Sequence, residues 1–158
     1  MSRTGIGYDS HRFVPGRPLI LGGQRIPHPA GLAGHSDADA VAHAVTDAVL
    51  GAAAAGNIGA LFPDSDARWK DADSMELLGT AHELVRGRGL TLAQADCAVI
   101  TEAPRLGPHL IAMGSALAAR LGVDAGAISV KAKTNEGMGF VGRGEGLAVI
   151  AVAVLEAR

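Results

Sequence analysis

Cysteine and aromatic residues are scarce in this chain, and each shortage excludes a class of protein. Cys97 is the only cysteine, so the chain has no internal disulfide and no zinc site built from several thiolates. One Trp, one Tyr and three Phe, a net charge of −2 and no basic block leave neither the stacking platforms nor the basic stripe of a nucleic-acid-binding protein. We therefore expect no nucleic-acid partner.

Long apolar runs and targeting patterns are also missing. The longest charge-free apolar run, residues 147–155, is too short to span a bilayer. The opening residues MSRTGIGYDSH lack the charged-then-apolar pattern of a signal peptide. A composition of 48% hydrophobic and 19% charged residues is typical of a globular chain. We expect one domain over residues 1–158, a cytoplasmic location and no membrane partner.

Hydrophobic periodicity and turn residues divide the chain into alternating strands and helices. We expect, in order, a strand, a hairpin turning at Gly22-Gly23, two helices, a strand, a helix and two strands; their ranges are 4–13, 18–27, 36–55, 74–89, 91–100, 108–122, 128–136 and 146–157. The first helix starts at Ser36 or Asp37, and Gly56 ends it. Residues 56–73 have no period and predict a long loop, which is often functional.

This order predicts an α/β fold of the α+β sandwich type, with a mixed, mostly antiparallel sheet and helices on one face. The last strand is apolar on both of its faces, from Leu147 to Leu155. No second helix layer is available to cover the outer face, so an oligomer is one way to bury it. The alternative is a modestly exposed face of Ala and Val, which is common in proteins.

Three residues suggest a metal site. Asp9 and His11 are two apart in a predicted strand and share a face, while His43 lies within the first predicted helix. Two imidazoles and one carboxylate form a zinc-type ligand set, and three protein ligands leave a position open for catalysis. The alternatives are ordinary: a turn cap at Asp9, an exposed strand residue at His11 and a hydrogen-bonded core histidine at His43.

The start of the first predicted helix favours an anion. His35 and Ser36 are placed there, where unpaired backbone N–H groups and the helix dipole attract phosphate. Asp37 and Asp39 suit the same dipole. Asp47 follows His43 by four residues, so it either orients the imidazole or is a solvated surface residue.

A second polar group follows the strand that begins at residue 128. Thr134 and Glu136 share a face of that strand, and Lys133 points the opposite way. The next turn, GMGFVGRGEG, places five glycines around Phe140 and Arg143, which brings backbone amides and a guanidinium near an anion. Together with the metal set, these features predict a phosphorylated substrate handled by metal ions.

Four segments carry a resemblance that extends over essentially the whole chain. GYDSHRF, GHSDADAVAHAVTDAVLGAAAAGNIGALFPDSD, EAPRLGPH and KAKTNEGMGFVGRGEG resemble the 2-C-methyl-D-erythritol 2,4-cyclodiphosphate synthases of the non-mevalonate isoprenoid pathway. The resemblance implies a homotrimer with each active site between neighbouring subunits. It implies Zn²⁺ at Asp9, His11 and His43, and a second ion, Mg²⁺ or Mn²⁺, at Glu136. His35 and Ser36 would hold phosphate, and His35 with Thr134 would stabilise the transition state as the catalytic residues.

The same resemblance implies contacts with a small, CDP-bearing substrate. Phe62 to Asp66 would lie near the methylerythritol unit, and the segments 101–107 and 133–136 would form the cytidine and diphosphate pocket. The full implied set is Asp9, Ser10, His11, His35, Ser36, Asn57, Ile58, Gly59, Phe62, Pro63, Asp64, Ser65, Asp66, Thr101, Glu102, Ala103, Pro104, Arg105, Leu106, Gly107, Lys133, Thr134, Asn135, Glu136, Phe140 and Arg143.

The implied reaction is an intramolecular phosphoryl transfer. The 2-phosphate of the substrate attacks the β-phosphorus of its own CDP arm, CMP leaves, and a cyclic diphosphate remains. The enzyme then has to fold the substrate, neutralise its charge and align the attack. A metal-dependent phosphohydrolase and a non-catalytic nucleotide-binding trimer are the alternative functions.

The chain departs from the family pattern at four positions. Asn57 replaces a usual Asp, which retains hydrogen bonding and loses a charge. Arg105 replaces a usual Lys and keeps the charge, whereas Lys133 stands where a small hydroxyl residue is common. Ile150 occupies a place where some relatives carry an acid, which makes the trimer axis more apolar.

Overall fold

The computed structural model describes residues 1–158 and is built on a five-stranded sheet. The strand order is β4-β1-β7-β5-β6, and every pairing is antiparallel except the parallel pair β5–β6. A separate two-stranded sheet pairs β2 with β3. The strands are β1 (Ser2–Pro15), β2 (Leu19–Leu21), β3 (Gln24–Ile26), β4 (Ala30–Leu32), β5 (Leu90–Ile100), β6 (Ile128–Lys133) and β7 (Gly146–Ala157). The predicted mixed, mostly antiparallel sheet is confirmed.

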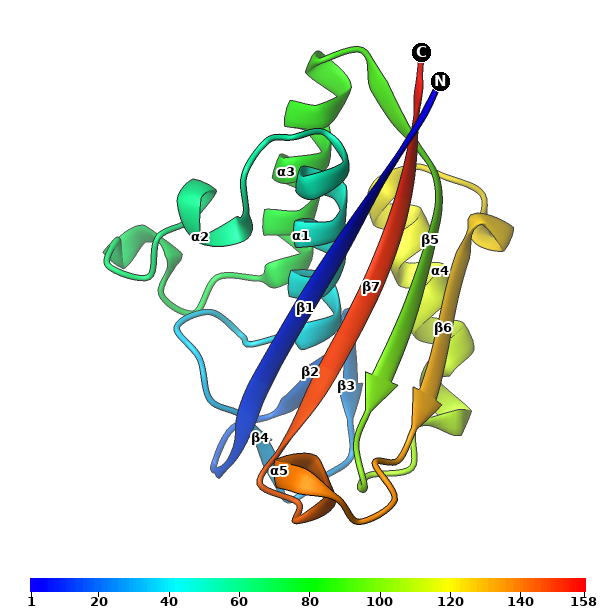
Figure 1. Ribbon diagram of the computed structural model, residues 1–158. Helices are drawn as coiled ribbons and strands as arrows, with labels where there is room; N and C mark the ends of the chain where they lie inside the picture. Colours follow the sequence, from blue (N-terminus) through cyan, green and yellow to red (C-terminus); the bar gives the residue numbers. More distant parts are fainter.

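Three long helices, α1, α3 and α4, lie together on one side of the sheet (Figure 1). Helix α1 packs on β1 and β7, and α4 packs on β6. The helices are α1 (Ala40–Ala52), α2 (Ile58–Leu61), α3 (Ser74–Gly87), α4 (Leu110–Leu121) and α5 (Gly139–Gly142), with 3₁₀ turns η1 (Ala67–Trp69), η2 (Gly107–His109) and η3 (Ala125–Ala127). No helix combines the length and the apolar character needed to cross a membrane.

Two glycines set the distance between β1 and α1. Gly5 and Gly7 are buried on the face of β1 that also carries Asp9 and His11. A Cβ at Gly7 would lie 1.9 Å from the carbonyl oxygen of Ala44, and a Cβ at Gly5 would lie 2.1 Å from a carbonyl of the same helix. The helix backbone therefore packs directly on the strand, which brings α1 side chains to the level of the β1 ligands.

Helix α1 begins later than the sequence predicts. Its N-cap is Asp39, whose carboxylate accepts hydrogen bonds from the backbone N–H groups of Val41 and Ala42. The same carboxylate accepts from the N–H groups of Gly22 and Gly23 at 2.8 and 2.7 Å, which fastens the β2–β3 turn to the helix. The predicted starts at Ser36 and Asp37 are wrong, and the helix also ends at residue 52, before the predicted 55.

Other element boundaries also differ from the predicted ones. In stretches without a clear hydrophobic period, capping side chains start short helices that the sequence pattern does not predict. The predicted loop 56–73 contains α2 and η1, capped by the side chains of Asn57 and Asp66. The strand predicted over 128–136 ends at Lys133, so Thr134 and Glu136 lie beyond it. The short elements β4 and α5 are absent from the predicted order, whereas the hairpin at 18–27 forms as β2 and β3.

No long helix covers the second face of the sheet, and only the short α5 lies near one end of it (Figure 1). Ile6 and Tyr8 of β1 are 70% and 56% exposed there, and their neighbours across the sheet, Val152 and Ile150 of β7, are 36% and 39% exposed. These four residues are called the open apolar face below. The predicted absence of a second helix layer is confirmed.

Candidate metal centre and neighbouring pockets

Asp9, His11 and His43 meet between β1 and α1. The ligand atoms that these three residues offer all lie within 4.8 Å of one another. Nε2 of His11 is 2.8 Å and Nδ1 of His43 is 3.1 Å from Oδ2 of Asp9, and the two ring nitrogens are 3.3 Å apart. The three residues singled out in the sequence therefore do lie together. Two imidazole nitrogens and one carboxylate oxygen in such a cluster fit a divalent metal ion of the zinc type.

Hydrogen bonding fixes which nitrogen of His11 faces the cluster. Nδ1 lies 2.6 Å from the carbonyl oxygen of Ala33, and since a carbonyl only accepts, Nδ1 carries the proton. Nε2 is then the ring nitrogen that faces Asp9. The ring of His43 presents its other nitrogen to the cluster, with Nδ1 toward Asp9 and Nε2 2.8 Å from the hydroxyl of Ser74.

The cluster is electrostatically coupled. Burial raises the pKa of Asp9, but the close contacts with the imidazoles of His11 and His43 and their charges outweigh burial and hold that pKa below its ordinary value. Burial lowers the pKa of His11, but the hydrogen bond and charge of Asp9 outweigh it and leave that pKa raised. A carboxylate that stays ionised is the form that binds a metal ion.

Asp47 does not contact His43 in the way the helical spacing suggests. Its Oδ1 accepts a hydrogen bond of 2.7 Å from the backbone N–H of Ile58, and no hydrogen bond joins it to His43. Burial raises the pKa of Asp47. The residue is half-buried, so it is also not the solvated surface residue of the alternative interpretation. It fastens the start of α2 to α1.

A pocket of about 420 Å³ opens beside the metal cluster. It collects predicted substrate residues from three segments, namely His11, His35, Ser36, Ile58, Gly59, Phe62, Pro63 and Asp64. The predicted metal ligand His43 also lines it, together with Gly34, Trp69 and Leu77. Trp69 was not predicted; its ring packs edge-on against Phe62 with centroids 5.0 Å apart. The only Trp of the chain, placed in a loop suspected of function, was the available signal.

His35 and Ser36 reach this pocket by a different route from the predicted one. They precede the N-cap of α1, and the carboxylate of Asp39 already accepts from the first N–H groups of that helix. The helix N-terminus is therefore not the anion site that the sequence suggested. Nε2 of His35 lies 3.2 Å from the carbonyl oxygen of Asp66, and Asp66 itself caps η1 and pairs with Arg68.

A second pocket, of about 550 Å³, lies where the parallel strands β5 and β6 end. Most of its lining belongs to the predicted nucleotide segments: Thr101, Glu102, Pro104, Arg105, Leu106, Gly107, Lys133 and Thr134, joined by Pro108, Leu110 and Ala132. Oε1 of Glu102 accepts from the N–H groups of Asn135 and Gly137 at 2.8 and 3.2 Å, which ties the two segments together. Ala103, Asn135 and Glu136 do not line this pocket.

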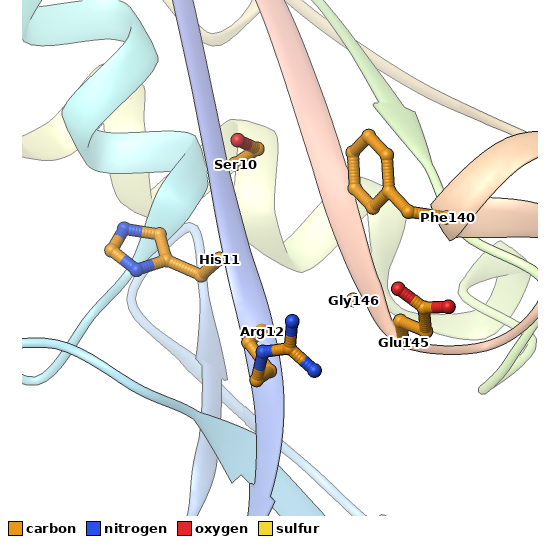
Figure 2. Close-up of a pocket in the computed structure, with 6 residues that line it drawn as sticks. All are labelled: Ser10, His11, Arg12, Phe140, Glu145 and Gly146. Atoms are coloured by element: carbon orange, nitrogen blue, oxygen red, sulfur yellow. The ribbon is translucent and has the colours of Figure 1, made fainter.

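The glycine-rich turn borders a third hollow, of about 260 Å³, near the open apolar face. Figure 2 shows the ring of Phe140 and the carboxylate of Glu145 on one side of β1, while His11 turns to the other side, toward α1. Arg143 donates from Nε to Glu145 at 2.7 Å, so its guanidinium already has an acidic partner. Ser10 lines this hollow and not the metal pocket, and Ser65 lines none of the three.

Comparisons with known proteins cover the whole length of this chain. The model of the YgbB family matches residues 2–156. The 2-C-methyl-D-erythritol 2,4-cyclodiphosphate synthase of Salinibacter ruber is 54% identical over 154 residues, which are 98% of each protein. A solved structure of a 2C-methyl-D-erythritol-2,4-cyclodiphosphate synthase in a CDP-bound form matches 98% of this chain and 100% of its own, with 42% identity and a TM-score of 0.89.

A bifunctional enzyme contains a similar unit. The structure of the bifunctional IspDF from Campylobacter jejuni matches 100% of this chain with 45% identity and a TM-score of 0.97. The match spans 43% of that longer protein.

Proposed function

The chain belongs to the YgbB family, and we propose on that basis that it catalyses the 2-C-methyl-D-erythritol 2,4-cyclodiphosphate synthase reaction. It cyclises 4-diphosphocytidyl-2-C-methyl-D-erythritol 2-phosphate and releases CMP, a step of non-mevalonate isoprenoid synthesis. The observation that carries this assignment is the Asp9/His11/His43 cluster at the side of a pocket, in a chain that matches such synthases over 98% of its length.

Asp9, His11 and His43 would hold Zn²⁺. When bound there, the ion supplies positive charge that stabilises negative charge on the phosphates of the substrate. His35 and Ser36, which line the same pocket, would add hydrogen bonds to a phosphate. The attacking group is a substrate phosphate that is already ionised, so the chain needs no general base, and alignment becomes its main contribution.

The pocket at the ends of β5 and β6 would take the cytidine diphosphate end of the substrate. Arg105 and Lys133 line it and would offer two positive charges to phosphate, and Thr134, which also lines it, would stabilise the transition state. Glu136, an exposed carboxylate, would help to hold Mg²⁺ or Mn²⁺. One carboxylate is enough for such a site, because substrate phosphates and waters commonly complete the coordination of Mg²⁺.

A homotrimer would join these two pockets. Within one chain the two pockets are separated along the sheet. The metal cluster lies at β1, the second pocket lies at the ends of β5 and β6, and β7 runs between β1 and β5. A neighbouring copy that packs on the open apolar face would also remove Ile6 and Tyr8 from water. We propose an active site shared between copies of this single-domain chain, working in the cytoplasm.

The direct test is phosphorus NMR of the CDP-bearing substrate with the zinc-loaded protein and Mg²⁺. The cyclic diphosphate and CMP should appear in equal amounts, and His43→Ala should abolish both, whereas His28→Ala, a histidine outside the metal pocket, should not. Inorganic phosphate without the cyclic product would show a phosphohydrolase instead. Binding of CDP without turnover would show a nucleotide-binding protein.

A further inference from the structure

A chain of hydrogen bonds continues behind His43, on the side away from Asp9. Nε2 of His43 lies 2.8 Å from Oγ of Ser74, the first residue of α3. The hydroxyl of Ser74 donates in turn to Oδ1 of Asp37, and the backbone N–H of Ser74 donates to Oδ2 of the same carboxylate at 3.2 Å. Ser74 is completely buried, so no water competes for these bonds.

The direction of these bonds decides which nitrogen of His43 carries the proton. An ionised carboxylate only accepts, so the hydroxyl hydrogen of Ser74 points to Asp37. The oxygen of Ser74 then accepts a hydrogen bond, and Nε2 of His43 is the donor facing it. With the proton on Nε2, the lone pair of His43 lies on Nδ1, the nitrogen that faces Asp9.

We propose that Ser74 and Asp37 are positioning residues that hold His43 with Nδ1 toward the metal ion. The proposal rests on the metal site of the proposed function and adds the residues that orient one of its ligands. Outer partners of metal-bound histidines typically act in this way, fixing the tautomer and the orientation of the ring. The helical neighbour Asp47, by contrast, is already bonded to the backbone of Ile58.

Ser36 is the competing partner, and the geometry favours Ser74. Oγ of Ser36 is 3.2 Å from Nε2 of His43, compared with 2.8 Å for Ser74. Ser36 also accepts a hydrogen bond from the backbone N–H of Ala38 at 3.1 Å and has no carboxylate partner. Only Ser74 has its hydroxyl hydrogen committed to a carboxylate, which leaves an acceptor for the histidine.

A purely structural role is the alternative, because the Asp37–Ser74 contact also ties α3 to the segment before α1. The test therefore measures zinc alone on the metal-free protein, without substrate. Ser74→Ala removes the hydroxyl from the chain of hydrogen bonds, and Ser74→Thr keeps it. Thr46→Val is the matched control: it removes another completely buried hydroxyl, on α1 itself, which bonds only to the carbonyl of Ala42.

We expect Ser74→Ala to weaken zinc binding by about 10- to 100-fold in a chelator competition. Ser74→Thr should restore most of the zinc affinity. Thr46→Val should keep the wild-type zinc affinity even if it lowers the unfolding temperature as much as Ser74→Ala does. Nitrogen NMR of the ring should show the Nε2–H form of His43 in the wild type and a mixture of both tautomers in metal-free Ser74→Ala. These readouts respond to ring orientation and not to loss of stability alone.

Zinc affinity of Ser74→Ala within twofold of wild type, or an equal loss in Thr46→Val, would overturn the proposal. If Ser74→Ala does not fold, Asp37→Ala makes the same test, because it removes the acceptor of the Ser74 hydroxyl hydrogen; unchanged affinity and tautomer there would overturn the proposal equally. His43→Ala in the same titration distinguishes failure of the metal site from failure of the positioning role. Zinc retained in His43→Ala contradicts the metal site itself, whereas zinc lost there and retained in Ser74→Ala contradicts only the positioning role.

Discussion

Replacing Gly7 by alanine adds one methyl group between β1 and α1, and this should move the metal ligands on the two elements apart. The Cβ of an alanine at this position would lie 1.9 Å from the carbonyl oxygen of Ala44 and 2.8 Å from the backbone nitrogen of Ala48. Both atoms belong to the backbone of α1, so no side-chain rotation relieves the contact. Real Cβ atoms essentially never approach closer than 3.0 Å, so strand and helix must separate by at least the difference, 1.1 Å.

This displacement is large compared with what a metal site tolerates. His43 precedes Ala44 on α1, and Asp9 lies two residues after Gly7 on β1, so the separation acts on the distance between ligands. Ligand distances in zinc sites vary by only about 0.2 Å around their usual values. We therefore expect Gly7→Ala to lose most of its zinc affinity, together with about 1–3 kcal/mol of folding stability from overpacking.

The measurement is zinc content and affinity of purified Gly7→Ala, combined with calorimetric unfolding of the metal-free protein. For a chain of this size, each kcal/mol corresponds to roughly 2–4 °C in unfolding temperature. Gly87→Ala is the control, since a Cβ at this last residue of α3 meets nothing within 4 Å. Wild-type zinc affinity and an unchanged unfolding temperature in Gly7→Ala would refute the claim that α1 is held against β1 by the absence of a side chain.

Three further predictions address the loop, the pH dependence and the assembly. Asn57→Asp should change the cyclisation rate less than tenfold, because either residue caps α2; a larger gain, about 1.4 kcal/mol or more, would show that charge matters there. Burial lowers the pKa of His82, so the unfolded chain binds a proton that the folded chain excludes, and stability should fall as the pH drops below about 6.5. Urea unfolding at several pH values should show a flatter dependence in His82→Leu, and an unchanged slope would exclude His82 as the cause. Light scattering should give three times 16.0 kDa for the wild type and a smaller mass for Ile6→Glu on the open apolar face, and a wild-type monomer would contradict the trimer.

The alternation of side chains along β1 predicted which face carries the ligands Asp9 and His11. The same face carries the two glycines that let the backbone of α1 pack directly on the strand. Residues 5, 7, 9 and 11 share one face, and the first two of them are glycines. Glycine inside a strand is a sign of close backbone approach, so the pattern indicated in which direction a helix would come near. It did not indicate which helix, because that depends on tertiary packing.

The start of α1 was not predictable from local residues, because several good caps follow one another. Ser36, Asp37 and Asp39 are all preferred N-cap residues. Asp39 is selected by a contact that the local sequence does not contain, the hydrogen bonds from Gly22 and Gly23 in the distant turn between β2 and β3. Because Asp39 caps the helix, the side chains of Ser36 and Asp37 can bond elsewhere. Ser36 lies within hydrogen-bond distance of His43, and Asp37 accepts from Ser74, which contacts His43.

The difference between Asp47 and Ser74 shows where sequence spacing stops being informative about a metal site. Spacing of four residues correctly puts Asp47 on the same side of α1 as His43. An imidazole, however, has two nitrogens on opposite edges, and the edge away from the metal meets whatever segment packs there. In this fold that segment is the first turn of α3, 31 residues further along the chain. Ligands of such a site can be read from local periodicity, but the groups that orient them come from long-range packing, and only variants at those distant positions can show how far they control the metal.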